Sequence, residues 1–241
     1  MNPPQNFYNM DKIEELREDF VLTNLTDKEF EDRFNKIAKN LFNNFIIKTS
    51  YGDFRFEEIE FYFHSKNHAD YIAHPRKSEP LIWYINDFGG IDINFKSEAK
   101  KQNPNDPWSK YCWDEESYYG GILIRQLKRI SDEFILDSPL KVAELFRNLG
   151  CATEGNGAMP QLVYVEGLPE ITLEPKPLTR NNLVKSEADE DYRKKLKTIS
   201  SWYSNKDLTD KVDSYKKQVD YLYRYINITN KKNKKNKKKR P

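Results

Sequence analysis

The sequence has only two cysteines, Cys112 and Cys151, too few and too far apart for a disulfide framework or a zinc framework. It also lacks long apolar runs. No stretch reaches the length of a membrane span, and Met1–Phe20 contains no apolar segment like that of a signal peptide. These absences argue against disulfide-stapled and membrane-spanning classes. They predict an intracellular protein, cytoplasmic (nucleoid-associated) or otherwise inside the cell.

Glycine is scarce, with nine residues in all. Its two adjacent pairs, Gly89-Gly90 and Gly120-Gly121, are not followed by the Gly-Lys-Ser/Thr of a phosphate-binding loop. No serine elbow and no Cys-His nucleophile pattern is evident. Aromatic residues make up 14% of the 241 residues, which favours a core rich in Phe and Tyr. The length predicts one domain with appendages, or at most two small domains.

Acidic and basic side chains are unevenly distributed along the chain. The net charge is +2, but the tail contains no acid and eight basic residues: Lys231, Lys232, Lys234, Lys235, Lys237, Lys238, Lys239 and Arg240. Without the tail, 32 basic residues face 38 acidic ones, so the body is mildly acidic. The composition predicts a disordered tail that binds the phosphates of a nucleic acid.

The stretch Phe54–His64 is the predicted centre of the fold, because it is aromatic and β-branched with no Gly or Pro. Side chains alternate between the two faces of a strand. One face carries the apolar residues Ile59, Phe61 and Phe63. The other face carries Glu58, Glu60, Tyr62 and His64. Phe54 and Phe56 fall on this acidic face, so the phase slips near Glu57. A bulge, or a strand covered on both faces, would explain the slip. An ordinary strand with surface glutamates is the alternative interpretation.

Hydrophobic spacing and capping signals predict four helical regions. They are a short helix over Asp11–Phe20 after a loose arm Met1–Met10, a helix from the capping box Thr26/Glu29 to about Asn43, a helix from Ser138-Pro139 to Gly150, and helices from Ser186 onwards. The last region includes a narrow apolar seam that predicts packing on the body or on a second copy of the chain: Leu208, Val212, Tyr215, Val219, Leu222 and Ile226.

Six further stretches are predicted as strands: Phe45–Thr49, Leu81–Asn86, Ile91–Lys96, Gly120–Ile130, Gln161–Val165 and Ile171–Leu173. The expected fold class is α+β, a single domain with an antiparallel-rich mixed sheet flanked by helices. We divide the chain into an N-terminal arm and short helix (1–25), the α+β domain (26–180), a C-terminal helical extension (181–228) and a disordered basic tail (229–241).

Two groups of residues invite a metal hypothesis. Three histidines, His64, His68 and His74, occur within eleven residues beside acidic neighbours, but their spacing matches no zinc signature. A Mg²⁺ nuclease would instead use four residues of the predicted sheet, Glu58, Glu60, Asp92 and Lys96.

Four pieces of sequence occur in an informative order: Ile37-Ala38-Lys39-Asn40-Leu41-Phe42, Phe45-Ile46-Ile47, Glu58-Ile59-Glu60-Phe61-Tyr62 and Ile122-Leu123-Ile124-Arg125. This order resembles the alkyladenine (3-methyladenine) DNA glycosylase family. That family has a helix ending in Ala-Arg-x-Leu-Leu-Gly, a strand, the motif Glu-Thr-Glu-Ala-Tyr and a later strand reading Val-Leu-Ile-Arg or similar. The resemblance covers roughly residues 35–127.

The resemblance implies roles for particular residues. It implies that Glu60 is the general base, that Tyr62 stacks on a flipped base, and that Arg125 lies near the catalytic water. In the following loop it implies Asp70 with one of two histidines. The residues that it implies for substrate binding are Tyr62, His68 or His74, Tyr84, Asn94 with Asp92 as a competing choice, and Leu123. The implied partner is duplex DNA carrying a modified purine, with no cofactor and no metal.

The sequence also departs from that family. The hairpin tip reads Phe88-Gly89 instead of Tyr-Gly, and the segment between Asn94 and Arg125 is longer than expected. The implied chemistry is nonetheless consistent with the residues, because N-glycosidic bond cleavage passes through an oxocarbenium-like state that a carboxylate stabilises. An unperturbed Glu ionises near pH 4.3, so Glu60 is a competent base at pH 7.

Three hypotheses therefore remain: a glycosylase, a non-catalytic nucleic-acid-binding or interaction protein, and a metal-dependent nuclease. The first requires Glu60, Tyr62, Tyr84 and Arg125 to line one pocket. The nuclease requires Glu60, Asp92 and Lys96 to converge, and binding alone requires neither arrangement.

Overall fold

The structure is a computed structural model that describes residues 5–23, 25–86, 88–149, 159–174, 177–181, 183, 185–203 and 206–229. The basic tail, for which we predict disorder and phosphate contacts, lies outside the described residues, as do Gly150 and Cys151. The helices in the described part are α1 (Gln5–Asp19), α2 (Asp27–Asn44), α3 (Pro139–Leu149), α4 (Asp189–Tyr203) and α5 (Val212–Val219).

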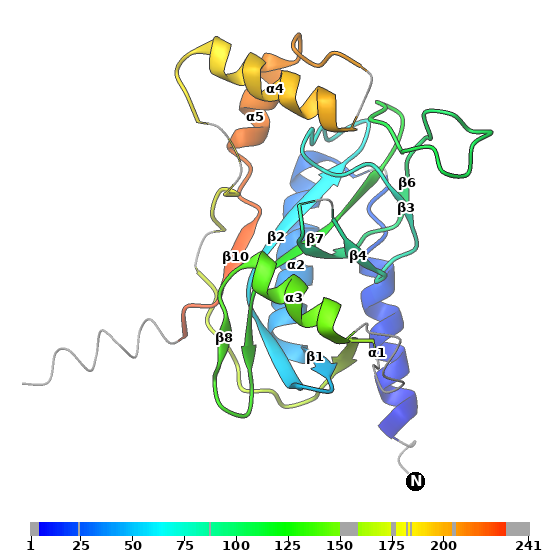
Figure 1. Ribbon diagram of the computed structural model, residues 1–241. Coiled ribbons are helices and arrows are strands. Elements are labelled where there is room, and N and C mark those ends of the chain that lie inside the picture. The colour runs from blue at the N-terminus through cyan, green and yellow to red at the C-terminus, as the bar shows by residue number, and fades with distance from the viewer. Residues whose placement is uncertain are drawn as a thin grey trace, which may run out of the picture.

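The strands form one large antiparallel sheet and one small one (Figure 1). Their bounds are β1 (Phe45–Thr49), β2 (Gly52–His64), β3 (Lys77–Ser78), β4 (Trp83–Ile85), β5 (Ile91–Asn94), β6 (Ser97–Glu98), β7 (Tyr119–Arg129), β8 (Ile135–Leu136), β9 (Gln161–Tyr164) and β10 (Arg224–Ile226). The order across the large sheet is β4-β5-β7-β2-β1-β9, with β10 paired to β2 and β8 to β7, while β3 and β6 form the small sheet. The predicted α+β class with an antiparallel-rich sheet is confirmed.

Helices cover both faces of the large sheet. In Figure 1, α2 runs behind it, α3 crosses in front of it, and α4 with α5 lies over one end. The predicted capping box is present at Thr26 and Glu29, and the apolar stripe of α2 is buried. The Phe34 ring lies 4.4 Å from the Phe61 ring, centroid to centroid. No helix of the described part is both long and apolar enough to cross a membrane.

The phase slip near Glu57 is a bulge, and β2 is also buried on both faces. The β2–β7 register shifts between Phe56 and Glu58 and shifts back between Glu58 and Ile59. Glu57 on β2 and Arg125 on β7 are therefore the residues left without an opposite partner. On both strands, the core-facing side chains switch between even-numbered and odd-numbered positions at this bulge. Bulges of this kind re-aim side chains and are frequent beside functional sites.

Two of the predicted element boundaries are wrong. The predicted loose arm Met1–Met10 is helical from Gln5. No Gly or Pro interrupts the segment between Gln5 and the buried anchors Leu16 and Phe20, so the helix extends back from them. Ile171–Leu173 forms no strand, only a single bridge from Leu173 to Asn227. The prolines that follow in the sequence lack the N–H groups that would extend a ladder.

The long helix predicted over the seam from 208 to 226 is also wrong. Helix α5 covers only Val212–Val219, and the chain then forms strand β10, which pairs with β2. Tyr223 and Tyr225 are buried, whereas Leu222 is 43% exposed. The alternation Tyr-Leu-Tyr-Arg-Tyr-Ile from residue 221 has the period of a strand, and pairing with β2 decides in its favour.

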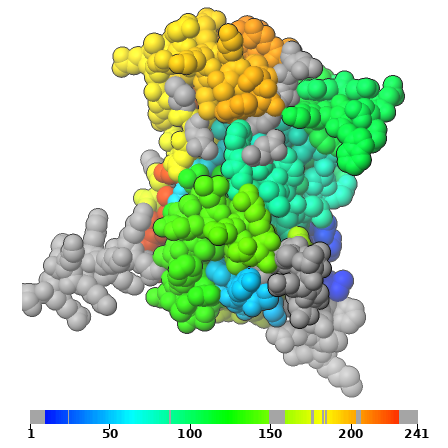
Figure 2. Space-filling model, in the orientation of Figure 1, coloured from blue at the N-terminus to red at the C-terminus, as the bar shows by residue number. Residues whose placement is uncertain are grey.

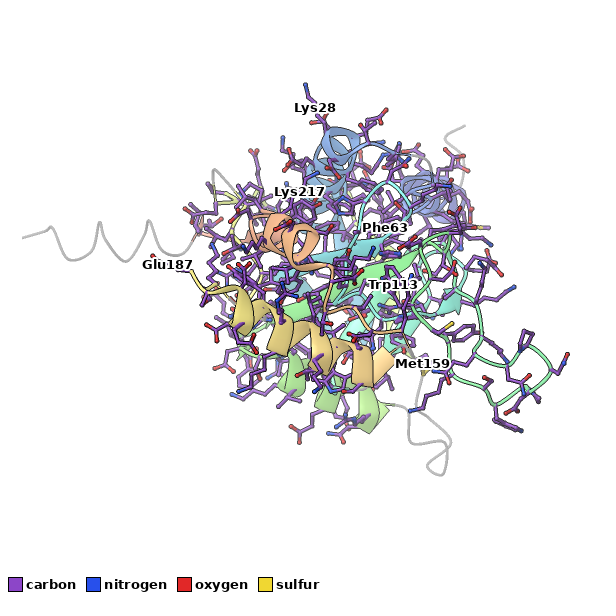
Figure 3. All side chains as sticks on the ribbon, turned by 90° about the horizontal axis from the view of Figure 1, so that it is seen from above. Lys28, Phe63, Trp113, Met159, Glu187 and Lys217 are labelled. Carbon is purple, nitrogen blue, oxygen red and sulfur yellow. The ribbon has the colours of Figure 1, made fainter. Side chains whose placement is uncertain are left out.

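The remaining seam residues pack within the chain. Leu208, Val212, Tyr215 and Val219 are buried in one cluster with Tyr192, Leu196 and Ile199 of α4. Figure 3 looks down on α4 and α5, which lie side by side, and labels Trp113, a member of the same buried cluster. The structure therefore agrees with the hypothesis that the seam residues pack within the same chain. Self-association through residues 208–226 stays a prediction.

Candidate functional site

One row of side chains runs across five strands of the large sheet. The paired residues in this row, from β4 to β10, are Tyr84, Asp92, Leu123, Glu60 and Arg224. Side chains that are directly opposite in adjacent strands lie on the same face of a sheet. The register thus places four of the predicted site residues on one face, although they come from three separate parts of the sequence.

The next row on this face brings in two more predicted residues. Asn94 pairs with Gly121, and Gly121 pairs with Tyr62. A Cβ at position 121 would lie 3.0 Å from the Ile93 carbonyl oxygen and 3.1 Å from the Asp92 Cβ, so glycine suits this crowded position. Glycine at position 121 thus allows the close approach of β5 to β7 between Tyr62 and Asn94.

A cavity of about 510 Å³ lies over these rows, between the sheet, the start of α3 and helix α4. Figure 2 shows the face on which α4 and α5 form a block above α3. Five predicted site residues line the cavity: Tyr62, His74, Asp92, Leu123 and Arg125. Further lining comes from residues that include Arg76, Phe88, Leu140, Lys195 and Trp202.

Glu60 lies beneath the cavity lining and has no exposed surface. The Tyr62 hydroxyl donates to Glu60 Oε2 at 2.6 Å, and Arg125 donates to the same oxygen at 3.1 Å. The backbone N–H of Asn181 donates to Oε1 at 3.0 Å. Arg125 also donates to Glu58 at 2.9 Å. Because hydrogen bonds and an arginine satisfy the carboxylate, its complete burial is tolerated.

Tyr62 is held as a neutral donor between two charged groups. Burial, together with the Glu60 carboxylate, raises the pKa of Tyr62 well above its usual value. On its ring lies the guanidinium of Arg180, 4.7 Å from the ring centroid. Arg180 donates to Asp70 at 2.6 Å, and Asp70 also accepts the Phe63 N–H at 3.0 Å. This buried ion pair fixes the end of β2 and the loop that follows it.

Arg76 organises the β4–β5 side of the cavity. Its guanidinium donates to Asp92 and to the Asn94 side-chain oxygen, each at 2.8 Å, and lies 4.2 Å from the Tyr84 ring centroid. Asn86 donates to the other Asp92 oxygen at 3.1 Å. Of the two candidates for this position, Asp92 lines the cavity, while Asn94 supports Arg76. Tyr84 lies on the same face but is not part of the cavity lining, and neither is Glu60. Of the four residues that the glycosylase hypothesis requires in one pocket, only Tyr62 and Arg125 therefore line it.

The three histidines lie in three different environments. His74 lines the cavity, and burial with a contribution from Arg76 lowers its pKa to about 3, so the ring is neutral. His68 is buried against Tyr221, and its Nδ1 lies 2.7 Å from the Asp27 carboxylate, away from the cavity residues. His64 accepts the Asp70 N–H and lies 3.1 Å from the Asp114 carbonyl oxygen. Of the two loop histidines, His74 is the one that joins the site.

The nuclease arrangement does not form in the structure. Lys96 pairs with Glu79, Asp92 pairs with Arg76, and Glu60 pairs with Arg125. Within the residues that the structure describes, no group of three or more His, Cys, Asp or Glu side chains could hold a metal ion.

Sequence reasoning missed several residues of the site. Arg76 and Arg180 each occur alone in irregular segments, where no periodicity or motif marks them. Lys195 and Trp202 lie on α4, where the apolar spacing marks only the side that packs on α5. The sequence predicts a helix that starts at Ser138-Pro139, but nothing in the sequence indicates that this helix start lines the same cavity as Tyr62 and Arg125.

Comparisons with known proteins provide little further information. No family model matches the chain, and no solved structure matches it. The chain is 32% identical over 131 residues to the uncharacterized protein L759 of Acanthamoeba polyphaga mimivirus. This match covers 48% of this chain and 58% of that protein, so the chain spans less than two thirds of the relative's length.

Proposed function

We propose that this chain is a DNA base-excision glycosylase that hydrolyses the N-glycosidic bond of an alkylated or deaminated purine. The observation that carries the proposal is the register row, which gathers Glu60, Leu123 and Asp92 on one face beneath a cavity lined by Tyr62 and Arg125. These are the residues for which the glycosylase resemblance implies a role. Residues 35–127, which carry the resemblance, include β2, β4, β5 and most of β7.

The cavity has the chemical character that an extruded base requires. A base-flipping enzyme stacks the base between aromatic or apolar side chains and reads its edge by hydrogen bonds. Tyr62, Phe88 and Trp202 supply aromatic rings, while Leu123 and Leu140 supply apolar surface. Asp92 and Arg76 supply an acceptor and a donor on the same wall.

Glu60 supplies the charge that bond cleavage requires. Arg125 donates to it, and a fixed carboxylate under the sugar stabilises the cationic transition state. To activate a water, Oε2 exchanges the Tyr62 hydroxyl for that water, since the two hydrogen bonds compete for one oxygen. Because the phenol oxygen is fixed to its ring, this exchange requires a shift of the whole Tyr62 side chain or of Glu60.

One observation favours a second function, nucleic-acid binding without catalysis. Glu60 has no exposed surface, and both of its oxygens accept hydrogen bonds from the protein. In that case the Glu60–Arg125 pair is a structural element that shapes the cavity floor. The two functions differ in whether removal of the Glu60 charge affects a reaction or only the stability.

Glu60→Gln tests the proposal directly. It preserves the shape of the side chain and removes the negative charge, so base release should fall by about 10²–10⁴-fold while the fold is retained. The measurement is abasic-site formation on DNA carrying alkylated purines or hypoxanthine, read out by alkaline cleavage. Glu58→Gln is the matched control, because Glu58 also accepts from Arg125 but lies in a different register row, and its loss should be milder.

Additional measurements separate the alternatives. Thermal melting of both variants monitors folding. This control is needed because the NH₂ group that Glu60→Gln introduces would be placed against a hydrogen-bond donor from Tyr62, Arg125 or Asn181. Base release should persist in EDTA. A wild-type protein that binds damaged DNA but releases no modified purine would support the binding function. Mg²⁺-dependent strand cleavage without an abasic site would support the nuclease.

A further inference from the structure

Lys195 of α4 places an amine in the cavity. It lines the same space as Tyr62 and Arg125 and is partly buried. Its Nζ lies 5.1 Å from the ring centroid of Trp202, which follows about two helical turns further along α4 and is also part of the lining. The amine therefore lies beside the aromatic surface that the proposed function assigns to an extruded nucleotide.

The other charges in the cavity are paired with one another. Arg76 is paired with Asp92, and Arg125 with Glu58 and Glu60. Among the residues that the structure describes, no ion pair joins Lys195 to a carboxylate. Burial lowers the pKa of its ammonium group, which increases the share of free amine at neutral pH. A desolvated lysine without an acidic partner is the form in which lysine acts as a nucleophile.

We propose that Lys195 is a nucleophile toward the aldehyde of an abasic sugar, which would give the chain a strand-cleaving lyase activity. The inference rests on the proposed function for the entry of DNA into the cavity, but it does not require base release by this protein. It assigns α4 a catalytic task that the glycosylase reaction leaves unassigned.

The reaction balances without an oxidant or a reductant. The Nζ lone pair attacks C1′ of the ring-opened sugar, and the carbinolamine loses water to give a protonated imine. Water then removes a proton from C2′, and the electron pair of that C–H bond forms the C2′–C3′ double bond. The C3′–O bond breaks at the same time and releases the phosphate group attached at C3′. Water hydrolyses the imine and restores the lysine, so the net change is one strand break.

Borohydride trapping on preformed abasic DNA tests the inference. The substrate is a duplex in which a separate uracil glycosylase has already created one abasic site, incubated with the full chain at pH 7 and sodium borohydride. We expect a covalent protein–DNA adduct whose peptide map places the linkage on Lys195. Lys195→Ala and Lys195→Arg should reduce the adduct to background. Lys197→Ala, on the exposed side of the same helix, should leave the adduct unchanged.

The two lysine variants separate an amine from a simple cation. Arg keeps the positive charge but cannot form this imine, so a phosphate-contacting role predicts normal DNA affinity for Lys195→Arg and weaker affinity for Lys195→Ala. Absence of an adduct with the wild type, or an adduct of normal yield in Lys195→Arg, would overturn the inference. A wild type that forms the adduct but releases no modified purine supports the lyase and refutes the proposed glycosylase. Base release without an adduct does the reverse.

Discussion

The two faces of β2 are equally buried but stay buried for different physical reasons. On one face, Ile59, Phe61 and Phe63 contact the aromatic core below α2, where Phe61 lies against Phe34 and Tyr225. On the other face are four residues that each carry a polar group: Glu58, Glu60, Tyr62 and His64. The first face is stabilised by the removal of apolar area from water, which requires no particular direction.

The second face is buried only because each polar group has a directional partner. Glu60 has Tyr62, Arg125 and the Asn181 N–H, and His64 has Asp70 and Asp114. The net contribution of one hydrogen bond to the stability of the fold is small, but a buried polar group that loses its partner destabilises the fold strongly. We expect stability to depend mainly on the face that carries Ile59, Phe61 and Phe63, whereas the face that carries Glu58, Glu60, Tyr62 and His64 holds polar groups at fixed positions.

Truncation of the apolar face should have the largest effect on stability. Phe61→Ala should reduce the free energy of unfolding by about 3–5 kcal/mol, because it removes a fully buried ring and leaves a cavity beneath α2. Urea unfolding at pH 7 measures this loss. Leu222→Ala is the control, since that side chain is 43% exposed and its loss should change stability by less than about 0.5 kcal/mol. Similar costs for both variants would contradict the assignment of the core.

The sequence predicts the two faces of β2 because short-range rules determine them. Alternation along Phe54–His64 separates the apolar and polar residues, and the phase slip near Glu57 correctly indicates a bulge. The capping box likewise predicts the start of α2 at Thr26. These features depend on residues that are close in sequence, for which period and local hydrogen bonding decide the structure.

Long-range register could not be predicted in this way. The partner of Glu60 on β10 is Arg224, and Arg180 reaches Asp70 from 110 residues away. The seam that ends at Ile226 fits a helical spacing and a strand alternation at once, and only the pairing of β10 with β2 decides between them. His68 is near the site in sequence, yet the loop turns it toward Asp27. Such choices depend on tertiary contacts that no local pattern contains.

Lowering the pH should destabilise the fold through the polar face of β2, because that face carries the titratable group His64. Burial lowers the pKa of His64 to about 4 from its usual 6.5, and its two partners match the neutral ring, since Nδ1 accepts an N–H. Below pH 6.5, His64 binds a proton in the unfolded chain but stays neutral in the folded chain until the pH approaches 4. The free energy of unfolding therefore decreases as the pH falls, by about 2 kcal/mol at pH 5 for this group.

His64→Gln removes this titration. We expect the variant to be less stable than the wild type at pH 7, but to have a shallower slope of unfolding free energy against pH between 6.5 and 5. The neutral His74 contributes to both proteins, and the difference in slope therefore isolates His64. The measurement is a series of urea titrations at fixed pH. Parallel slopes would mean that His64 titrates alike in both states.

The smallest of these effects should come from the single hydroxyl on the polar face. Tyr62→Phe removes the donor that lies 2.6 Å from Glu60 and keeps the ring under the Arg180 guanidinium. Hydrogen bonds to a charged group contribute about 1.5–3 kcal/mol, and Arg125 with Asn181 still satisfies the carboxylate. We therefore expect a loss near the lower end of this range, clearly below that of Phe61→Ala.

The reciprocal variant completes the comparison within two adjacent residues. Phe61→Tyr adds the hydroxyl that Tyr62→Phe removes, but its ring is surrounded by Phe34, Phe95 and Tyr225. A buried hydroxyl without a partner costs about 1–3 kcal/mol, so both exchanges should destabilise the fold, as urea titrations will measure. If Tyr62→Phe left stability unchanged while Phe61→Tyr reduced it, burial rather than directional bonding would account for both faces. If neither variant changed stability, the distinction between the two faces of β2 would be wrong.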